Sequence, residues 1–203
     1  MKLFFSPGAC SLAPHIVLRE AGLSFELDQV NLGTKQTASG KDFLQINPKG
    51  YVPTLQLDNG QVLTEGAVIL QYLADQVPRK HLAPPSGTLE RFHLMEWLTF
   101  ISSELHKAFS PLFNSKTPEE YRVIVRENLT KRIGFVAKQL EKTDYIGGDQ
   151  FSIADAYLFT VLCWTRPTKM DLAPWPSVVA YMDRVGSRPA VHAAMIAEGL
   201  IKG

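Results

Sequence analysis

The sequence predicts an α/β domain followed by an all-helical domain, and two changes of pattern along the chain support this prediction. Up to about residue 76, short apolar stretches typical of strands alternate with helical patterns, in the order β-α-β-(α)-β-β-α. After residue 64 no further strand-like alternation occurs, and apolar residues recur at helical spacing. The spacing of Leu94, Leu98, Ile101 and Leu105, for example, predicts one face of a helix. We therefore expect a mixed four-stranded sheet covered by helices, followed by a helical bundle.

Local signals set the elements of the first part. Gly22 ends the first helix, the residues near Phe43 favour a short helix within a polar segment, and Asn59-Gly60 is typical of a hairpin turn. A strand–helix–strand unit predicts parallel pairing, and the hairpin adds an antiparallel edge. We expect strands at residues 2–5, 25–30, 52–57 and 61–63, and helices at residues 11–22 and 65–76.

The second part follows a proline-rich segment that disfavours helix. Further along, Ser152 and Asp155 have the spacing of a capping box, in front of a segment that is apolar nearly all round and should be buried. The expected organisation is a domain at residues 1–77, a linker at 78–86 and an all-helical domain at 87–203. Its expected helices include residues 118–142, 154–164, 175–186 and 189–198.

Composition excludes several classes of function. The 203-residue chain has a formal net charge of +1, which indicates neither a nucleic-acid partner nor an anionic membrane. No apolar run approaches the roughly 20 residues that span a bilayer. Cys10 and Cys163 lie far apart and do not suggest a secreted disulfide framework. We expect a soluble, cytoplasmic protein with no nucleic-acid and no membrane partner.

Cys10 is the most informative residue, because it lies between a strand-ending turn and a helix start. Amides and the dipole at a helix N-terminus stabilise an anion, so a thiol there should have a lowered pKa. The alternative is that Cys10 is a small buried apolar residue. Position 13 is Ala13, so there is no Cys-x-x-Cys redox pair. Cys163, within an apolar stretch, is expected to pack in the core.

Three further positions carry chemistry only in combination. Val52-Pro53 opens a strand, where a cis bond exposes backbone groups to a peptide-like ligand and a plain strand start is the alternative. Glu65 begins a helix directly after a strand, and could grip an amino-acid head group or merely occupy a first turn. His106 could meet a thiol or belong to a solvated face. The histidines show no metal-ligand spacing, so no metal site is expected.

These features occur in one order along the chain and converge on a family. The motifs are Ser6-Pro7-Gly8-Ala9-Cys10-Ser11, Asn47-Pro48-Lys49-Gly50-Tyr51-Val52-Pro53, Thr64-Glu65-Gly66 and Ser152-Ile153-Ala154-Asp155-Ala156. From residue 1 to about 199 the chain resembles the bacterial beta-class glutathione S-transferases. The segment Glu104-Leu105-His106-Lys107 also resembles a helical motif of this class.

The resemblance implies a thioredoxin-like first domain, a helical second domain and a homodimer. It implies glutathione as co-substrate without a bound cofactor, a cis bond before Pro53, and Cys10 and His106 beside the glutathione thiol. Thr99 stands where the class often has Asn, and its shorter side chain reaches less far. The residues implied to bind glutathione are Ser11, Lys35, Val52, Pro53, Glu65, Gly66, Thr99, Ser103, Glu104, Leu105 and Lys107.

Individual roles follow from the same resemblance. Val52 would pair with the cysteinyl backbone of glutathione, and Lys35 would meet the glycyl carboxylate. Glu65 and Gly66 would hold the γ-glutamyl end, which Ser103 of the partner subunit and Glu104 of the partner subunit would approach.

The implied activity is conjugation of the glutathione thiolate to hydrophobic electrophiles, aromatic or halogenated, as in detoxification. Candidates for an apolar wall on the helical domain are Phe109, Phe113, Tyr157 and Trp164. One alternative is glutathione-dependent thiol–disulfide exchange through a Cys10 mixed disulfide. Another is a non-enzymatic ligand-binding or regulatory protein of the same fold.

Overall fold

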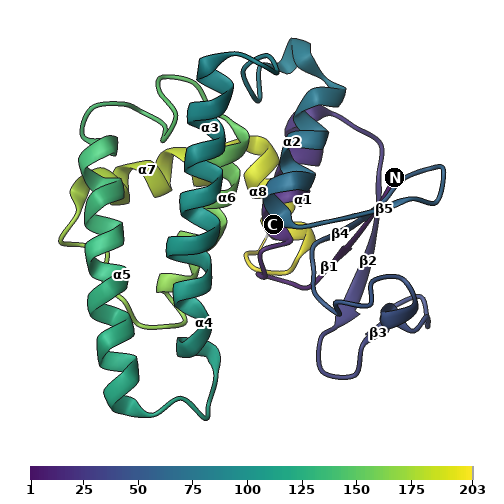
Figure 1. Ribbon diagram of the computed structural model, residues 1–203, viewed down its shortest axis with the longest axis horizontal. Coiled ribbons are helices and arrows are strands. Elements are labelled where there is room, and N and C mark those ends of the chain that lie inside the picture. Colours follow the sequence, from purple (N-terminus) through teal and green to yellow (C-terminus); the bar gives the residue numbers. More distant parts are fainter. Residues whose placement is uncertain (203) are drawn as a thin grey trace. The chain divides into compact units, whose positions relative to one another are not determined.

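The computed structural model describes residues 1–202, which form two compact units (Figure 1). The first unit comprises Met1–Ala83 together with the segment that starts at Ser187, and the second comprises Pro84–Gly186. The sequence-based division placed everything after residue 86 in the helical domain. The two divisions differ because helix α8 (Pro189–Ala197) packs against helix α1 (Leu12–Ala21) of the first unit.

The sheet of the first unit has five strands, where the sequence predicted four. The order is β3-β2-β1-β4-β5, with β1 and β2 parallel and every other neighbouring pair antiparallel. The additional strand β3 has only two residues and lies in the polar segment after β2, where no alternation could reveal it. The strands are β1 (Lys2–Phe5), β2 (Glu26–Asn31), β3 (Gln36–Thr37), β4 (Thr54–Gln56) and β5 (Val62–Thr64).

The central strand β1 is covered on both faces, since Leu3, Phe4 and Phe5 are all buried. Phe4 packs with Phe43, at 5.7 Å between ring centroids, in a cluster that also contains Val30 and Val52. Figure 1 shows α1 and α2 (Gly66–Gln76) side by side along one face of the sheet. Two 3-10 turns, η1 (Phe43–Gln45) and η2 (Pro78–Lys80), complete this part of the chain.

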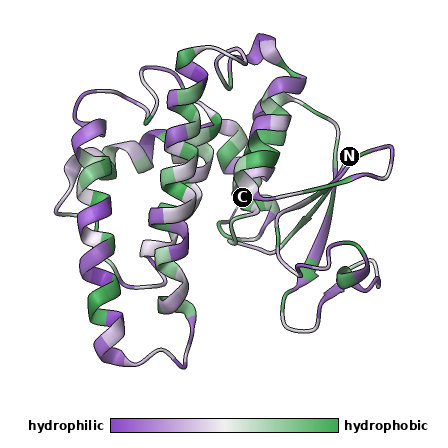
Figure 2. Ribbon diagram, in the orientation of Figure 1, coloured by the Kyte–Doolittle hydropathy of each residue, from purple (hydrophilic) through white to green (hydrophobic). Residues whose placement is uncertain are grey.

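The second unit is helical. Helix α6 (Ile153–Leu162) is buried along its whole length, as its apolar sequence predicted. Figure 2 shows hydrophilic residues distributed along α5 (Glu119–Leu140), which buries only one stripe of side chains. The other elements are α3 (Leu89–Phe100), the π-helical segment η3 (Ile101–His106), α4 (Lys107–Phe113), η4 (Cys163–Thr165) and α7 (Pro176–Gly186).

The π-helical segment η3 interrupts what the apolar spacing predicted as one regular helix. Ile101 and Leu105 are both fully buried, as that spacing required. Between them the chain winds more widely than an α-helix, a feature that is frequent at functional sites.

No helix within residues 1–202 is long and apolar enough to cross a membrane.

A buried carboxylate, Asp155, organises the start of α6. It is fully buried and accepts hydrogen bonds from the amides of Ile146 and Ser152, both at 2.8 Å, and from the hydroxyl of Tyr181 at 3.2 Å. The predicted capping box with Ser152 is confirmed. Burial raises the pKa of Asp155 to about 6, and its hydrogen bonds oppose that shift.

We expect Asp155→Ala to lower the free energy of unfolding by about 3 kcal/mol, because several buried donors lose their acceptor at once. Urea unfolding followed by circular dichroism measures this change. Asp171→Ala is the matched control: Asp171 also accepts one amide, from Ala173 at 2.9 Å, but in an exposed turn. A loss for Asp155→Ala no greater than for Asp171→Ala would contradict the organising role.

Candidate functional site

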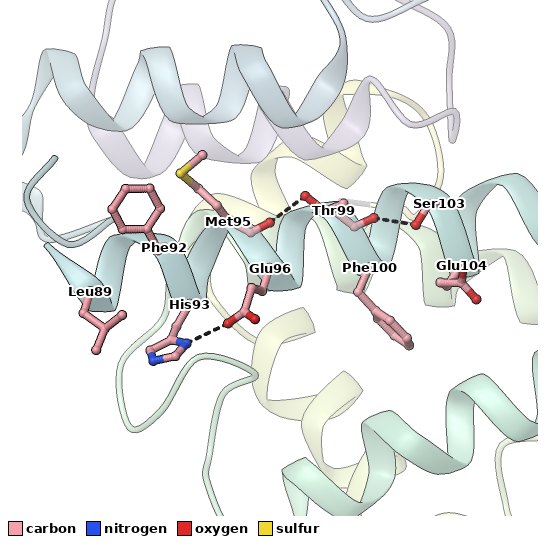
Figure 3. Close-up of a pocket in the computed structure, with 9 residues that line it drawn as sticks. All are labelled: Leu89, Phe92, His93, Met95, Glu96, Thr99, Phe100, Ser103 and Glu104. Atoms are coloured by element: carbon pink, nitrogen blue, oxygen red, sulfur yellow. Dashed lines mark hydrogen bonds and ion pairs between the residues drawn. The ribbon is translucent and has the colours of Figure 1, made fainter. Parts of the chain in front are cut away.

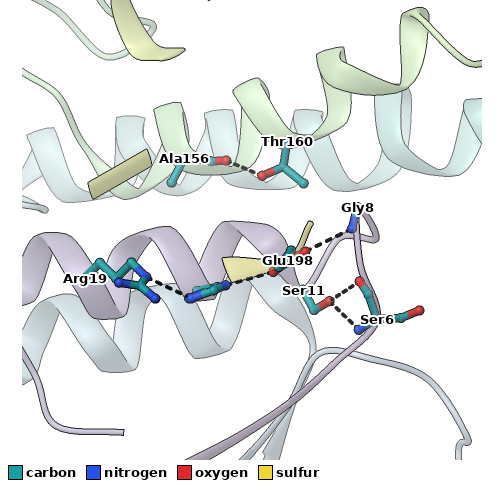
Figure 4. Close-up of polar contacts among 8 residues, drawn as sticks. Ser6, Gly8, Ser11, Arg19, Ala156, Thr160 and Glu198 are labelled. Atoms are coloured by element: carbon teal, nitrogen blue, oxygen red, sulfur yellow. Dashed lines mark hydrogen bonds and ion pairs between the residues drawn. The ribbon is translucent and has the colours of Figure 1, made fainter. Parts of the chain in front are cut away.

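The turn between β1 and α1 presents Cys10 in the first unit. The Cys10 thiol donates a hydrogen bond to the Val52 carbonyl oxygen at 3.2 Å. Ser11, by contrast, is fully buried, and its hydroxyl is engaged with the backbone of Ser6 (Figure 4). It donates to the Ser6 carbonyl at 3.2 Å and accepts from the Ser6 amide at 3.1 Å. In this structure, Ser11 therefore shapes the turn.

The Val52 segment faces Cys10 and is supported by Asn47. The Val52–Pro53 peptide bond is cis, in agreement with the resemblance. The Asn47 side-chain amide donates to the Tyr51 carbonyl and to the Thr54 hydroxyl, both at 2.9 Å. This fixes the loop that leads into β4.

Lys35 lies against the same loop. Its ammonium group donates to the Gly50 carbonyl at 2.8 Å and lies 5.8 Å from the centre of the Tyr51 ring. The backbone of Lys35 is left-handed, with φ of 59°. A non-glycine residue held in this region often marks a functional constraint.

Glu65 stands at the start of α2 in an uncommon backbone conformation, with φ 69° and ψ 113°. Its carboxylate pairs with Lys49 at 2.6 Å, and Lys49 also donates to the Thr64 hydroxyl at 3.0 Å. The first amides of α2, beginning with Gly66, belong to the helix turn that has no preceding carbonyls. Lys49 belongs to the Asn47–Pro53 motif, but no pattern in the sequence indicates its ion pair with Glu65.

These contacts bring four predicted positions of the first unit together. Cys10 touches Val52, Lys35 touches the loop just before Val52, and Lys49 of that loop holds Glu65. One group of side chains therefore combines a thiol, an accessible carboxylate and two ammonium groups. Such a set suits a ligand that carries charges of both signs along a peptide-like backbone.

In the second unit, His106 lies in an aromatic cluster. Its Nδ1 shares a 2.7 Å hydrogen bond with the Tyr157 hydroxyl, and its ring centre is 4.8 Å from that of Trp164. Phe109 and Phe113 pack edge-on against Trp164. All four aromatic residues considered for an apolar wall therefore gather around or beside His106.

Burial lowers the pKa of His106 from 6.5 to about 4, and the positive charge of Lys107 contributes less to the same shift. The imidazole is therefore neutral at pH 7. A neutral ring can donate or accept a hydrogen bond, but it supplies no fixed positive charge.

Three further predicted residues, Thr99, Ser103 and Glu104, line an open groove along α3 and η3, of about 670 Å³ (Figure 3). The hydroxyls of Thr99 and Ser103 bond back to their own helix, to Met95 at 2.8 Å and to Thr99 at 3.0 Å. Glu104 pairs with Arg132 at 2.7 Å. Apolar side chains, including the exposed Phe92, form much of the rest of the groove.

Leu105 and Lys107 have opposite surroundings. Leu105 is fully buried, so its side chain belongs to the core, whereas Lys107 is exposed. Cys163 is of intermediate exposure, and desolvation by the surrounding protein raises the pKa of its thiol to about 12. Within residues 1–202, no group of three or more His, Cys, Asp or Glu side chains could hold a metal ion.

Comparison with known proteins gives a consistent result. Residues 8–76 match the family model "Glutathione S-transferase, N-terminal domain", and residues 100–189 match "Glutathione S-transferase, C-terminal domain". The chain is 50% identical to glutathione S-transferase GstA of Escherichia coli O157:H7, over 98% of this chain and 100% of that protein. It is 31% identical to the disulfide-bond oxidoreductase YfcG of Escherichia coli K12, over 97% and 94% of the two chains.

Solved structures of bacterial glutathione S-transferases have the same fold as this chain. The ternary complex of BphK, a bacterial GST, superposes with a TM-score of 0.97 and 61% identity, covering 98% of this chain and 100% of that one. A bacterial beta-class glutathione S-transferase of Sphingomonas chungbukensis gives a TM-score of 0.96 and 47% identity, over 99% and 100% of the chains. With both family models matched in order, this chain belongs to the glutathione S-transferase family and groups with its bacterial beta class.

Proposed function

We propose that the protein conjugates the thiolate of glutathione to small hydrophobic electrophiles, aromatic or halogenated. The observation that carries this proposal is the joined set of Cys10, Val52, Lys35 and Glu65 in the first unit, which would suit a peptide-like thiol that carries charges of both signs. Membership of the family supports the same activity.

Glutathione would use each of these groups. The Val52 backbone would pair with the cysteinyl residue, Lys35 would meet the glycyl carboxylate, and Glu65 would bind the γ-glutamyl ammonium group. The Glu65 carboxylate is already paired with Lys49. The ammonium group of the ligand would therefore share this carboxylate with Lys49 or displace Lys49 from it. The amides at the start of α2 suit the γ-glutamyl carboxylate.

Cys10 and His106 would lie beside the glutathione thiol, as the resemblance implies. His106 is neutral at pH 7, so it would act as a hydrogen-bond partner to sulfur, with its orientation held by Tyr157. Trp164 and Phe113 would contact the electrophile beside it. In the conjugation step, the glutathione sulfur forms a bond to carbon while the leaving group departs with its electron pair.

We also propose a homodimer, in which the groove along α3 meets a second copy of the chain. Exposed apolar residues line this groove, including Leu89 and Phe92, and such a patch is typical of an interaction surface. Ser103 and Glu104 lie along it and would reach the partner subunit's glutathione. A cytoplasmic location remains a prediction from the sequence.

Thiol–disulfide exchange is the second candidate function, and the relative named a disulfide-bond oxidoreductase supports it. The Cys10 thiolate would attack the glutathionyl sulfur of a mixed disulfide and release the other thiol. A second glutathione would then displace Cys10 and leave as oxidised glutathione. The exposure of Cys10 is intermediate, and it forms no disulfide in the structure.

Glu65→Gln should weaken glutathione binding about 10- to 100-fold, because a charge-assisted hydrogen bond to the ammonium group becomes a neutral one. Isothermal titration calorimetry with glutathione measures the change. Glu26→Gln is the matched control, since Glu26 also pairs with a lysine, Lys2 at 3.2 Å, on the same unit. Equal affinities for the two variants would remove Glu65 from the site.

Cys10→Ala should retain conjugation of a chloronitroaromatic electrophile within about tenfold, because the nucleophile is the thiol of glutathione itself. The same variant should lose the glutathione mixed disulfide entirely. His106→Ala should lower kcat about tenfold, through loss of one oriented hydrogen bond. Steady-state kinetics and intact-protein mass spectrometry measure both effects; loss of all conjugation in Cys10→Ala would instead favour Cys10 as the nucleophile.

The His106 imidazole should stay neutral down to about pH 4, where its lowered pKa places the titration. An NMR titration of the Cε1 proton, assigned with His106→Gln, measures the midpoint directly. Between the unfolded value of about 6.5 and the folded value, only the unfolded chain binds the proton at this site, so the contribution of His106 to stability falls as the pH falls. A midpoint at pH 6 or above would show that the ring is not desolvated as described.

A further inference from the structure

A buried carboxylate near the end of the chain contacts the turn that carries Cys10. Glu198 follows α8, and its side chain is fully buried together with that of His15. One oxygen of Glu198 accepts from the Gly8 amide at 2.9 Å, and the other lies 2.9 Å from His15 Nδ1 (Figure 4). Gly8 lies two residues before Cys10 in the turn after β1.

The hydrogen bonds determine where the protons are. Arg19 Nε donates to His15 Nε2 at 2.9 Å, and an arginine side chain can only donate. His15 Nε2 therefore carries a lone pair, and the ring proton is on Nδ1, which donates to Glu198. Two donors thus converge on Glu198, one on each oxygen. A glutamine could accept only one of them and would turn its own donor toward the other.

We propose that Glu198 is a positioning residue for Cys10, supplied by the C-terminal segment. On one side the turn is fixed by the hydrogen bonds between Ser6 and Ser11, and on the other by Glu198 and Gly8. Gly8 has φ of 69°, and a Cβ at this position would lie 3.2 Å from the Leu200 side chain. The C-terminal segment thus lies directly against the turn, and Glu198 holds the Cys10 thiol at the Val52 carbonyl through Gly8.

A purely structural role for Glu198 is the alternative, and the chain offers a matched control for it. Arg188, at the start of α8, forms a two-point ion pair with Glu20 of α1, at 2.6 and 3.0 Å. This pair also ties α8 to α1, and its two hydrogen bonds run between Arg188 and Glu20 and not to the residue 6–11 turn. Glu20→Gln therefore loosens the attachment of α8 without loosening that turn.

The test compares Glu198→Gln, Glu198→Asp and Glu20→Gln with the wild-type protein. The rate of Cys10 alkylation by iodoacetamide is measured by peptide mass spectrometry, with Cys163 as an internal reference for global opening. In Glu198→Gln we expect Cys10 to react at least about threefold faster than in Glu20→Gln, because the released turn frees the thiol from Val52. Glu198→Asp keeps both acceptors and should give an intermediate rate.

Equal Cys10 rates in Glu198→Gln and Glu20→Gln, or a matching acceleration of Cys163, would overturn the proposal. If Glu198→Gln does not fold, Glu198→Asp carries the same comparison, and a Cys10 rate no faster than in Glu20→Gln is the overturning result. The catalytic meaning of this positioning rests on the proposed function, but alkylation requires no glutathione. A wild-type protein without conjugating activity would therefore remove the proposed function and leave the positioning result intact.

Discussion

The pairing of β1 with both of its neighbours is the constraint on which the candidate site of the first unit depends. β2 runs parallel to β1, and β4 runs antiparallel to it with Phe4 opposite Thr54. The chain therefore leaves β1 and β2, and enters β4, at the same edge of the sheet. β5 is antiparallel to β4, with Thr64 opposite Thr54, so its exit lies there too. These four strand ends are flanked by the predicted site residues: Cys10, Lys35 and Glu65 follow β1, β2 and β5, and Val52 precedes β4.

Much of this arrangement could be predicted from the sequence, because it depends on short-range signals. The strands, the Asn59-Gly60 hairpin, the capping box at Ser152 and the buried helix α6 each have a local pattern, and the structure contains them all. Strand β3 has no such pattern, since two polar residues carry no alternation. The π-helical winding of η3 was missed for a related reason: buried residues at helical spacing are compatible with either winding.

The site was predictable in its residues and much less so in its electrostatics. The ion pair between Lys49 and Glu65 joins residues 16 apart across a loop, and no spacing rule identifies it. The neutrality of His106 depends on burial beside Tyr157, which is 51 residues away in sequence. The resemblance implied that Ser11 binds glutathione. In the structure its side chain is fully buried and accepts a hydrogen bond from the Ser6 amide, and this burial depends on tertiary packing that no local pattern indicates. No single residue predicts glutathione as the ligand; that prediction rests on the resemblance of the whole set of motifs to one family.

The first unit is discontinuous, since Met1–Ala83 is completed only by the segment that begins at Ser187. On a ribosome, the whole second unit is synthesised before α8 and Glu198 can reach α1. The sheet and its first two helices can pair early, but α8 and Glu198, which pack against α1 and Gly8, are synthesised only after the second unit. A nascent chain therefore spends the synthesis of residues 84–186 with a future core surface of α1 uncovered. A chaperone that binds this surface of α1 would be needed during that interval. A slowly translated codon between residues 84 and 186 would lengthen the time for which the surface is exposed.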